Sequence, residues 1–297
     1  MTPKRPGLST RAIHGAGHAK EARDPVATPI VQSATFVSAV GSREEVLYTR
    51  YGNNPNQVAL AERLAALEGA EAAIFLASGM GATALAHLAI LRPGDHLLSS
   101  DWIYGGTRRL FEGEFTRLGI DVSFVDPSRP RGWKTRLRTT TRAVFLETPT
   151  NPLMRVIDLE PVANLCKAEG IALLVDSTFA SPINFRPLEH GADVVIHSAT
   201  KYLNGHSDVI AGAVAGSTEM VEEVRRLMQV WGQALDPHAA WLLDRGMRTL
   251  DVRMARHNAN GLAVAEWASQ HPAIAKVHYP GLATHPDHEV AARTLDG

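Results

Sequence analysis

Short apolar runs alternate with helical repeats over the middle of the chain. Runs rich in branched and aromatic residues occur at 72–77, 94–99, 120–125, 143–147, 171–175 and 194–196, and each predicts a strand. Apolar positions at helical spacing lie between them, at 58–68, 82–91, 107–118 and 159–169. Nearly continuous apolar strands separated by helices are typical of a mostly parallel sheet covered on both faces. The pattern therefore predicts an α/β fold.

The two ends of the chain depart from this alternation. Residues 1–57 show no sustained repeat and contain turn signals, which predicts an extended arm that packs on a neighbour. Beyond residue 212 the repeats are helical at 219–231, 237–244 and 249–271, and a strand is predicted at 273–279. We therefore divide the chain into an N-terminal arm (1–57), a large α/β domain (58–245), and a linking helix with the start of a C-terminal domain (246–297).

The composition narrows the classes of partner. The 297 residues carry a formal net charge of −1, which gives no reason to expect nucleic acid or a membrane surface as a partner. The N-terminus lacks the apolar segment of a signal peptide, and no apolar stretch approaches the length of a membrane span. The one cysteine, Cys166, suits a reducing compartment, so we expect a cytoplasmic protein. His285 and His288 lack a third ligand nearby, and we expect no metal site.

One lysine stands where a buried strand is expected to end. The run Val194–Ile196 leads through Ser198 and Thr200 to Lys201. A desolvated lysine amine loses its proton readily and can form a Schiff base with an aldehyde cofactor. Two flanking hydroxyl groups could hold a phosphate of that cofactor. A solvated lysine in an ordinary loop is an equal alternative from these residues alone.

Two further strand ends carry groups that suit a charged cofactor. The sequence Ser78-Gly-Met-Gly81 joins a strand to a helix, so its backbone N–H groups could bind a phosphate, although the same sequence is often only a tight turn. Asp176 ends a buried strand, where it either meets a cation or caps the following turn. Asp176 and Lys201 are one strand and crossover apart. Both should therefore lie at the carboxyl edge of neighbouring strands, where open α/β sheets bind ligands.

The segment from Asp193 to Ser207 resembles the lysine signature of the Cys/Met-metabolism family of pyridoxal-phosphate enzymes, which includes cystathionine lyases and synthases. The resemblance covers essentially the whole chain. It implies a fold-type-I transferase with a mostly parallel sheet flanked by helices, an N-terminal arm and a C-terminal domain that is cut short. It implies pyridoxal 5'-phosphate as the cofactor, bound by Tyr48, Arg50, Ser78, Gly79, Met80, Tyr104, Asn151, Asp176, Ser198, Thr200 and Lys201.

The resemblance also implies a role for each group. Lys201 would bind the cofactor covalently and move the α-proton of the substrate, while Asp176 would keep the pyridine nitrogen protonated. Tyr104 would stack on the ring and assist proton movement, which makes these three the expected catalytic residues. Asn151 would donate to the ring hydroxyl oxygen. Glu147 either borders the substrate or belongs to a polar turn.

The arm carries a second recognisable element. Tyr48 and Arg50 resemble the family's Tyr-x-Arg pair, which crosses a dimer interface to hold the partner's cofactor phosphate. A surface ion pair is the alternative from spacing alone. The family commonly continues Gly-Asn-Pro-Thr, whereas this chain reads Gly52-Asn-Asn-Pro-Asn56 with one extra residue. We expect a homo-oligomer in which a dimer shares its sites and assembles into a tetramer.

The implied reaction makes or cleaves a C–S bond at Cβ or Cγ of a small sulfur amino acid. Cystathionine lyase or cystathionine γ-synthase is the favoured activity, with homoserine-ester sulfhydrylase as an alternative. Methionine γ-lyases typically have Cys where this chain has Gly106. The family's C-terminal domain supplies an arginine for the substrate carboxylate, and this sequence stops at Gly297, where that domain would begin. A cofactor-binding but catalytically incomplete fragment is therefore a further alternative.

Overall fold

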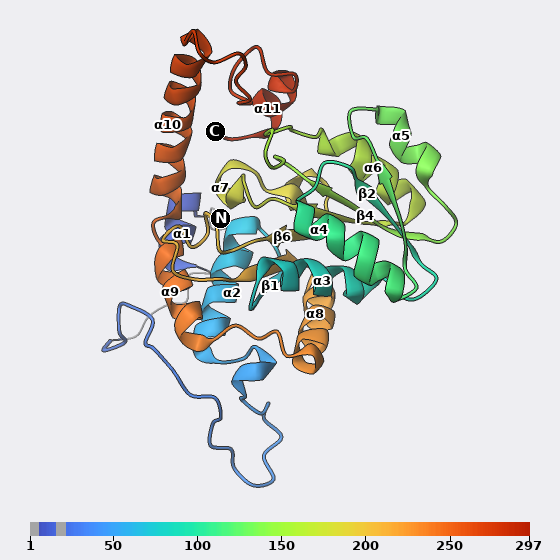
Figure 1. Cartoon of the computed structure of the whole chain (residues 1–297). Coiled ribbons are helices and arrows are strands. Elements are labelled where there is room, and N and C mark those ends of the chain that lie inside the picture. Colours follow the sequence, from blue (N-terminus) through green and yellow to red (C-terminus); the bar gives the residue numbers. More distant parts are fainter. Residues whose placement is uncertain (1–5, 16–21) are drawn as a thin grey trace, which may run out of the picture. The chain divides into compact units, whose positions relative to one another are not determined.

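The computed structural model describes residues 6–15 and 22–297 (Figure 1). Residues 1–5 and 16–21 of the predicted arm lie outside the described residues. Part of the N-terminus for which we expect no signal peptide is therefore not described. The chain forms two compact units. The first comprises Met1–Ala89 with Ile196–Leu250, and the second comprises Ile90–Val195 with Asp251–Gly297. The predicted division into arm, large domain and C-terminal segment stays a prediction.

The described residues contain a seven-stranded, mostly parallel sheet flanked by helices (Figure 1), which confirms the predicted α/β class. The strand order is β1-β7-β6-β5-β4-β2-β3. In the second unit β2 pairs in parallel with both β3 and β4, and β4 pairs in parallel with β5. In the first unit β1 and β7 are antiparallel. The strands are β1 Ala72–Leu76, β2 His96–Ser100, β3 Asp121–Val125, β4 Thr141–Glu147, β5 Ala172–Asp176, β6 Val194–His197 and β7 Gly212–Gly216.

Strand β7 is the strand that the apolar pattern misses. Its sequence, Gly-Ala-Val-Ala-Gly, has little of the branched or aromatic character that marks the other strands. Small residues are required at its start, because a Cβ atom on Gly212 would lie 2.1 Å from the Ser78 carbonyl oxygen. Because β7 lies so close to the backbone after β1, its first position has no room for the branched or aromatic side chains that predict a strand.

The helices of the first unit pack around β1 and β7. Helix α2 (Pro55–Glu68) packs against β1 and against α9 (Pro237–Met247), and α8 (Thr218–Trp231) packs against both strands. The start of α2 is capped by Asn54 of the expected turn. Asn54 accepts a hydrogen bond from the Asn56 N–H at 2.9 Å, and Gln57 accepts one from the Asn54 N–H at 3.1 Å. This capping box fixes the beginning of the helix.

The stretch predicted to lack regular structure contains two short elements of this first unit. Helix α1 (Leu8–His14) packs on α2, with Ala12 buried. A 3₁₀ helix, η1 (Thr49–Tyr51), begins directly after Tyr48. The prediction was wrong at these places, because a seven-residue helix with one buried residue offers too short a repeat to detect.

The second unit has its apolar core beneath helix α6 (Leu159–Glu169). Side chains from β2, β4, β5 and α6 meet there and are joined by Trp133 and Phe185 from other segments. The remaining elements are α4 (Gly105–Arg109), continued by the π-helical turn η2 (Leu110–Phe115), α5 (Pro130–Arg136), α7 (Ser181–Asn184), the 3₁₀ helix η3 (Pro187–His190) and α11 (His288–Thr294). Helices α3 (Gly79–Ile90) and α10 (Leu250–Gln270) each begin in the first unit and end in the second.

The strand predicted at 273–279 does not form. The segment consists of turns and irregular backbone, and its one contact of note is the Tyr279 hydroxyl, which donates to the Asn258 carbonyl at 3.4 Å. Alternation of apolar and polar residues therefore misled the prediction. Across the described ranges, every helix falls short of either the length or the apolar character that a membrane crossing requires.

Candidate functional site

The turn after β1 is built as an anion-binding helix start. The Ser78 hydroxyl accepts a hydrogen bond from the Gly81 N–H at 3.0 Å, and the Ser78 carbonyl accepts one from Ala82 at 3.0 Å. Helix α3 runs for 12 residues from this turn. Gly79 and Met80 are the first two residues of α3, and the first N–H groups of a helix have no carbonyl acceptor within that helix. The turn thus presents backbone donors and the positive end of a helix dipole.

Glycine is needed in this turn because the lysine loop lies against it. A Cβ atom added to Gly79 would lie 2.8 Å from both Cβ and Oγ of Ser198. A Cβ atom on Gly81 would lie 2.0 Å from Oε1 of Gln233. The predicted phosphate turn and the predicted phosphate-binding Ser198 are therefore in contact within one unit.

The loop that carries Lys201 is held to β7 by Thr200. The Thr200 hydroxyl accepts from the Ala211 N–H at 3.0 Å and donates to the Ala211 carbonyl at 3.2 Å. The Lys201 N–H donates to the Ser198 carbonyl at 3.1 Å, which closes a turn. Because the Thr200 hydrogen is directed to Ala211, this hydroxyl braces the loop in the present conformation. Lys201 itself is exposed, so the desolvation expected of its amine is not seen.

A buried histidine–glutamate pair, which the sequence interpretation missed, lies beside the same loop. His197 ends β6 directly before Ser198, and its Nε2 lies 2.5 Å from Oε1 of Glu68, the last residue of α2. Both side chains are almost fully buried. Within the described part of the chain, His197 Nδ1 and Glu68 Oε2 have no hydrogen-bond partner. The signal available in the sequence was a histidine four residues before the lysine.

The second unit places two carboxylates side by side at strand ends. Glu147 is the last residue of β4 and Asp176 the last of β5, and the two are register partners in the parallel pair. Glu147 is buried, with 4% of its surface exposed. Burial and the neighbouring charge of Asp176 raise the pKa of Glu147 to about 8, although two backbone hydrogen bonds oppose this shift. The Glu147 carboxyl group therefore holds its proton more tightly than a free glutamate does.

Asp176 also caps the turn that follows it. Its Oδ1 accepts a hydrogen bond from the Thr178 N–H at 2.9 Å, and its carbonyl accepts one from Thr148 at 3.1 Å. The capping role that the sequence left open is thus present. A cap uses only one of the two carboxylate oxygens. The capping role of Asp176 is therefore compatible with a cation partner as well.

Tyr104 and Asn151 are both held by Glu147 through their backbone. The Tyr104 N–H donates to Glu147 Oε2 at 2.7 Å, and the Asn151 N–H donates to Glu147 Oε1 at 2.9 Å. The Tyr104 ring is 49% exposed and the Asn151 side chain is exposed. The structure thus brings together Tyr104, Asn151 and Asp176, three of the predicted residues, around a glutamate whose role the sequence left undecided.

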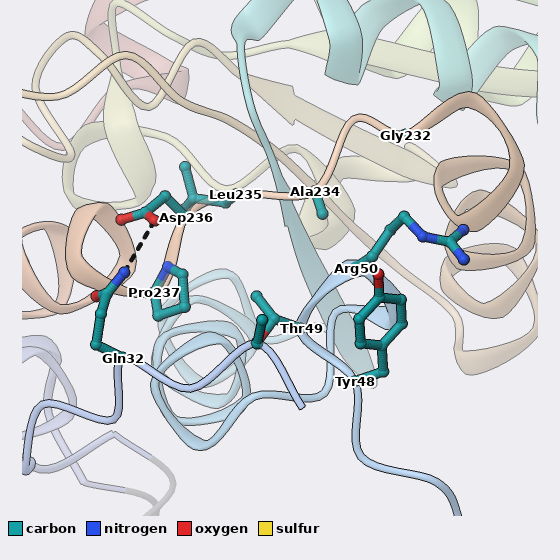
Figure 2. Close-up of a pocket in the computed structure, with 10 residues that line it drawn as sticks. Gln32, Tyr48, Thr49, Arg50, Gly232, Ala234, Leu235, Asp236 and Pro237 are labelled. Carbon is teal, nitrogen blue, oxygen red and sulfur yellow. Dashed lines mark hydrogen bonds between the residues drawn. The ribbon is translucent and has the colours of Figure 1, made fainter. Parts of the chain in front are cut away.

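In the arm, Arg50 lies over two tyrosine rings. The guanidinium carbon is 5.2 Å from the centroid of the Tyr48 ring and 5.3 Å from that of Tyr51. Figure 2 shows Arg50 beside Tyr48. One guanidinium nitrogen donates to the carbonyl of Gln229, in the last turn of α8, where a cation is favourable. Tyr48 and Arg50 therefore share one location, as their spacing predicts, although Arg50 belongs to a 3₁₀ helix instead of an extended segment.

The Tyr48–Arg50 segment lines a pocket of about 410 Å³ that is confined to the first unit. Figure 2 shows Arg50 and Tyr48 at one side of it and, at the other, Gln32 hydrogen-bonded to Asp236 at 3.2 Å. The extra asparagine of the following turn is also used, since Asn53 Oδ1 accepts from the Tyr48 N–H at 2.9 Å. The insertion therefore fixes the backbone of the Tyr48 segment.

Comparison with known proteins defines the class. The family model of Cys/Met metabolism PLP-dependent enzymes matches residues 9–297. The L-methionine gamma-lyase of Fusobacterium nucleatum subsp. polymorphum is 42% identical over 99% of this chain and 77% of its own length. A probable cystathionine gamma-synthase of Herpetosiphon aurantiacus is 40% identical over 98% of this chain and 91% of its own.

A solved structure agrees with these relatives. The cystathionine gamma synthase of Xanthomonas oryzae pv. oryzae, crystallised with aminoacrylate and cysteine, matches with a TM-score of 0.94 and 38% identity over 99% of this chain and 76% of its own. These matches confirm the expected fold of a pyridoxal-phosphate-dependent transferase. The chain belongs to the family of Cys/Met metabolism PLP-dependent enzymes.

The residues present fit pyridoxal phosphate, which carries a phosphate at one end and a basic ring nitrogen at the other. The Ser78–Gly81 turn offers backbone donors and has glycine where a Cβ atom would collide with Ser198. Asp176 ends β5 beside Glu147, whose pKa is raised by burial and by the charge of Asp176, so a protonated ring nitrogen next to Asp176 would be favourable. The first unit therefore offers groups suited to a phosphate, and the second offers a carboxylate suited to a protonated nitrogen.

Proposed function

We propose that this chain binds pyridoxal phosphate covalently through Lys201 and uses it to form or break the C–S bond at Cβ or Cγ of a sulfur amino acid. The observation that carries the proposal is the contact between the phosphate-type turn and the lysine loop. Gly79 packs on Ser198 with no room for a side chain, and Lys201 lies three residues further on. The close packing of a glycine turn on the loop that carries an exposed lysine favours a phosphate-and-amine site over two unrelated loops.

The phosphate would be held by the backbone N–H groups of Gly79 and Met80, with the hydroxyl groups of Ser78 and Ser198 close by. Thr200 contributes mainly by bracing the lysine loop against β7. The 12-residue helix α3 adds the positive end of its dipole. These groups orient the cofactor and supply no proton to the reaction.

Pyridoxal phosphate, when bound, supplies an electron sink for the bond-breaking step. Asp176 would keep the ring nitrogen protonated by its negative charge, and Asn151 would donate to the ring hydroxyl oxygen. Lys201 Nζ, released when the substrate amine takes its place, would accept the α-proton and return it later. Tyr104 would stack on the ring, and its hydroxyl is the second group positioned to move a proton.

The substrate class follows from the relatives. One relative structure was solved with aminoacrylate and cysteine, and both sequence relatives are named for activities on sulfur amino acids. Methionine γ-lyases typically have Cys where this chain has Gly106, which argues against a methionine γ-lyase activity. We therefore place this chain with the cystathionine lyases and the cystathionine γ-synthases.

Cystathionine is the substrate that separates these activities. Cleavage at Cβ releases homocysteine, cleavage at Cγ releases cysteine, and a γ-synthase instead forms cystathionine from cysteine and an activated homoserine ester. We expect the purified holoprotein to give one of these products by mass spectrometry, and Lys201→Ala to give none. Absence of every product from a protein that binds the cofactor would overturn the assigned reaction.

We propose further that the protein is a homo-oligomer whose dimer shares its cofactor sites through Tyr48 and Arg50, with a tetramer as the full assembly. Large apolar side chains on the arm support this proposal, because Val37 and Val40 are fully exposed and Val46 is 58% exposed. Surface of this kind in a contiguous segment is typical of a contact with another chain. The cytoplasmic location stays a prediction from the single cysteine.

Mixing two inactive chains tests the shared site. If Arg50 acts on the partner's cofactor, a dimer of one Arg50→Ala chain and one Lys201→Ala chain holds one intact site and one doubly altered site. Random subunit exchange makes half of the dimers mixed, so activity should recover to roughly a quarter of the wild-type value. Exchange demonstrated by mass with no recovered activity would show that Arg50 acts within its own chain.

A further inference from the structure

Glu147 binds the backbone of two separate loops with its two carboxylate oxygens. Oε2 accepts from the Tyr104 N–H, which follows β2, and Oε1 accepts from the Asn151 N–H, in the turn after β4. The side chain is 4% exposed. Helix α4, which begins directly after Tyr104, has no side-chain cap of its own.

A carboxylate is an expensive choice for this position unless both oxygens are needed. Burying a charged acid is unfavourable, and a neutral acceptor would satisfy one N–H group at lower cost. A glutamine at the same place would offer one acceptor oxygen and would direct an NH₂ donor at the second N–H group. Glutamate is the residue of this length that can accept from both loops at once.

Asp176 completes the arrangement. It is the register partner of Glu147 on the adjacent strand, and its carbonyl binds the N–H of Thr148, the residue after Glu147. The backbone of Tyr104 and Asn151 is thereby fixed relative to the strand end that carries Asp176. These three are the residues that would contact the cofactor ring.

We propose that Glu147 is the positioning residue for the ring-binding groups: it sets Tyr104 and Asn151 in register with Asp176 without touching the reacting atoms. This inference rests on the proposed function of the site. A loop clamp with no bearing on the cofactor is the competing explanation. The two differ in whether the loss of the carboxylate changes cofactor binding beyond what the loss of stability alone would cause.

The same strand offers a matched control at its other end. Thr141, the first residue of β4, is 2% exposed, and its hydroxyl accepts from the Arg138 N–H at 2.8 Å and lies 2.8 Å from His96 Nδ1. Thr141→Val removes this clamp with little change of shape. It therefore measures what a broken loop clamp on β4 does when the loop carries no predicted cofactor residue.

The experiment compares wild type, Glu147→Ala, Glu147→Gln and Thr141→Val as full chains titrated with pyridoxal phosphate. Bound cofactor is followed by its absorbance and by its induced circular dichroism, and thermal stability is measured on the same samples. We expect half-saturation to rise about tenfold or more for Glu147→Ala, which loses both backbone hydrogen bonds. Glu147→Gln should fall between Ala and wild type. Thr141→Val should bind as wild type does and retain its dichroism.

The outcomes separate this inference from the proposed function. Borohydride reduction followed by peptide mapping first shows whether wild type carries the cofactor on Lys201, and failure there removes the proposed function itself. If wild type carries the cofactor on Lys201, and Glu147→Ala then binds and orients the cofactor as wild type does, Glu147 is only a loop clamp and the inference is wrong. The same conclusion holds if Thr141→Val, at equal loss of stability, weakens binding as much as Glu147→Ala does.

Discussion

The two units present opposite chemistry at the residues expected to bind the cofactor. The first unit offers hydrogen-bond donors and a cation: the amides of the Ser78–Gly81 turn, Ser198 and Lys201. The second unit offers acceptors and negative charge at the ends of β4 and β5, where Glu147 and Asp176 are neighbours. A phosphate requires the first set and a protonated ring nitrogen requires the second. The difference shows that each unit builds its own chemistry from local backbone, a helix start in the first and two strand ends in the second.

The donor residues of the first unit and the acceptor residues of the second are also stabilised differently. The donor side depends on the absence of side chains, since glycine at 79 and 212 lets the turn, the lysine loop and β7 approach within contact distance. The acceptor side depends on a buried acid whose two hydrogen bonds contribute about 1.5–3 kcal/mol each when the group is charged. Substitution of Gly79 or Gly212 should therefore act by collision, and substitution of Glu147 by loss of its two hydrogen bonds.

Removal of the lysine breaks the donor side completely. Lys201→Ala should abolish the adduct that borohydride traps between the protein and pyridoxal phosphate, because no amine remains at the end of the loop. Mass mapping of the reduced protein measures this directly. Lys167→Ala, which removes an exposed lysine on α6, is the matched control and should keep the adduct. A reduced cofactor found on any lysine other than Lys201 would defeat the assignment.

Neutralisation of Asp176 breaks the acceptor side in a graded way. Asp176→Asn keeps an oxygen that can cap Thr178 but removes the negative charge. Turnover should fall by at least about a hundredfold, which is the scale of a lost charge-stabilising group. Asp193→Asn is a suitable control, since Asp193 also accepts a backbone hydrogen bond, from Leu173 at 2.8 Å. Near-normal turnover of Asp176→Asn with full cofactor content would leave Asp176 as a turn cap alone.

The sequence predicted this division of chemistry better than it predicted the contacts that sustain it. The ends of β1, β5 and β6 were found because their apolar runs stop at Ser78, Asp176 and Ser198. In a mostly parallel sheet, such ends fall at defined edges. A periodic pattern is a local property, so every strand with branched or aromatic residues could be located.

Contacts between distant residues could not be located in this way. The His197–Glu68 pair joins residues 129 positions apart, and the Glu147–Tyr104 hydrogen bond spans 43. Nothing in the neighbourhood of Glu147 distinguishes a loop clamp from a polar turn residue. The small residues of β7 are explained only by the backbone that they approach. Such features depend on tertiary packing, which overrides local preference.

The pH dependence of stability sharpens the comparison on the acceptor side. The pKa of Glu147 is raised from 4.5 to about 8, so the folded chain binds more protons than the unfolded chain between these values, and the free energy of unfolding falls as pH rises. His87 and His96 act in the opposite sense, because burial lowers the pKa of each from 6.5 to about 4. Their contribution rises with pH and is complete above about 6.5.

The interval from pH 7 to pH 8 therefore isolates Glu147 from the two histidines. Over this interval the cofactor-free wild type should lose about 1 kcal/mol of unfolding free energy relative to Glu147→Gln, whose side chain does not titrate. Urea unfolding at several pH values measures both slopes, and Thr141→Val, with Glu147 intact, should follow the wild-type slope. Parallel curves for wild type and Glu147→Gln would mean that Glu147 is already charged at neutral pH. The Glu147 carboxylate would then be stabilised by the backbone donors of Tyr104 and Asn151 more strongly than burial and the charge of Asp176 destabilise it.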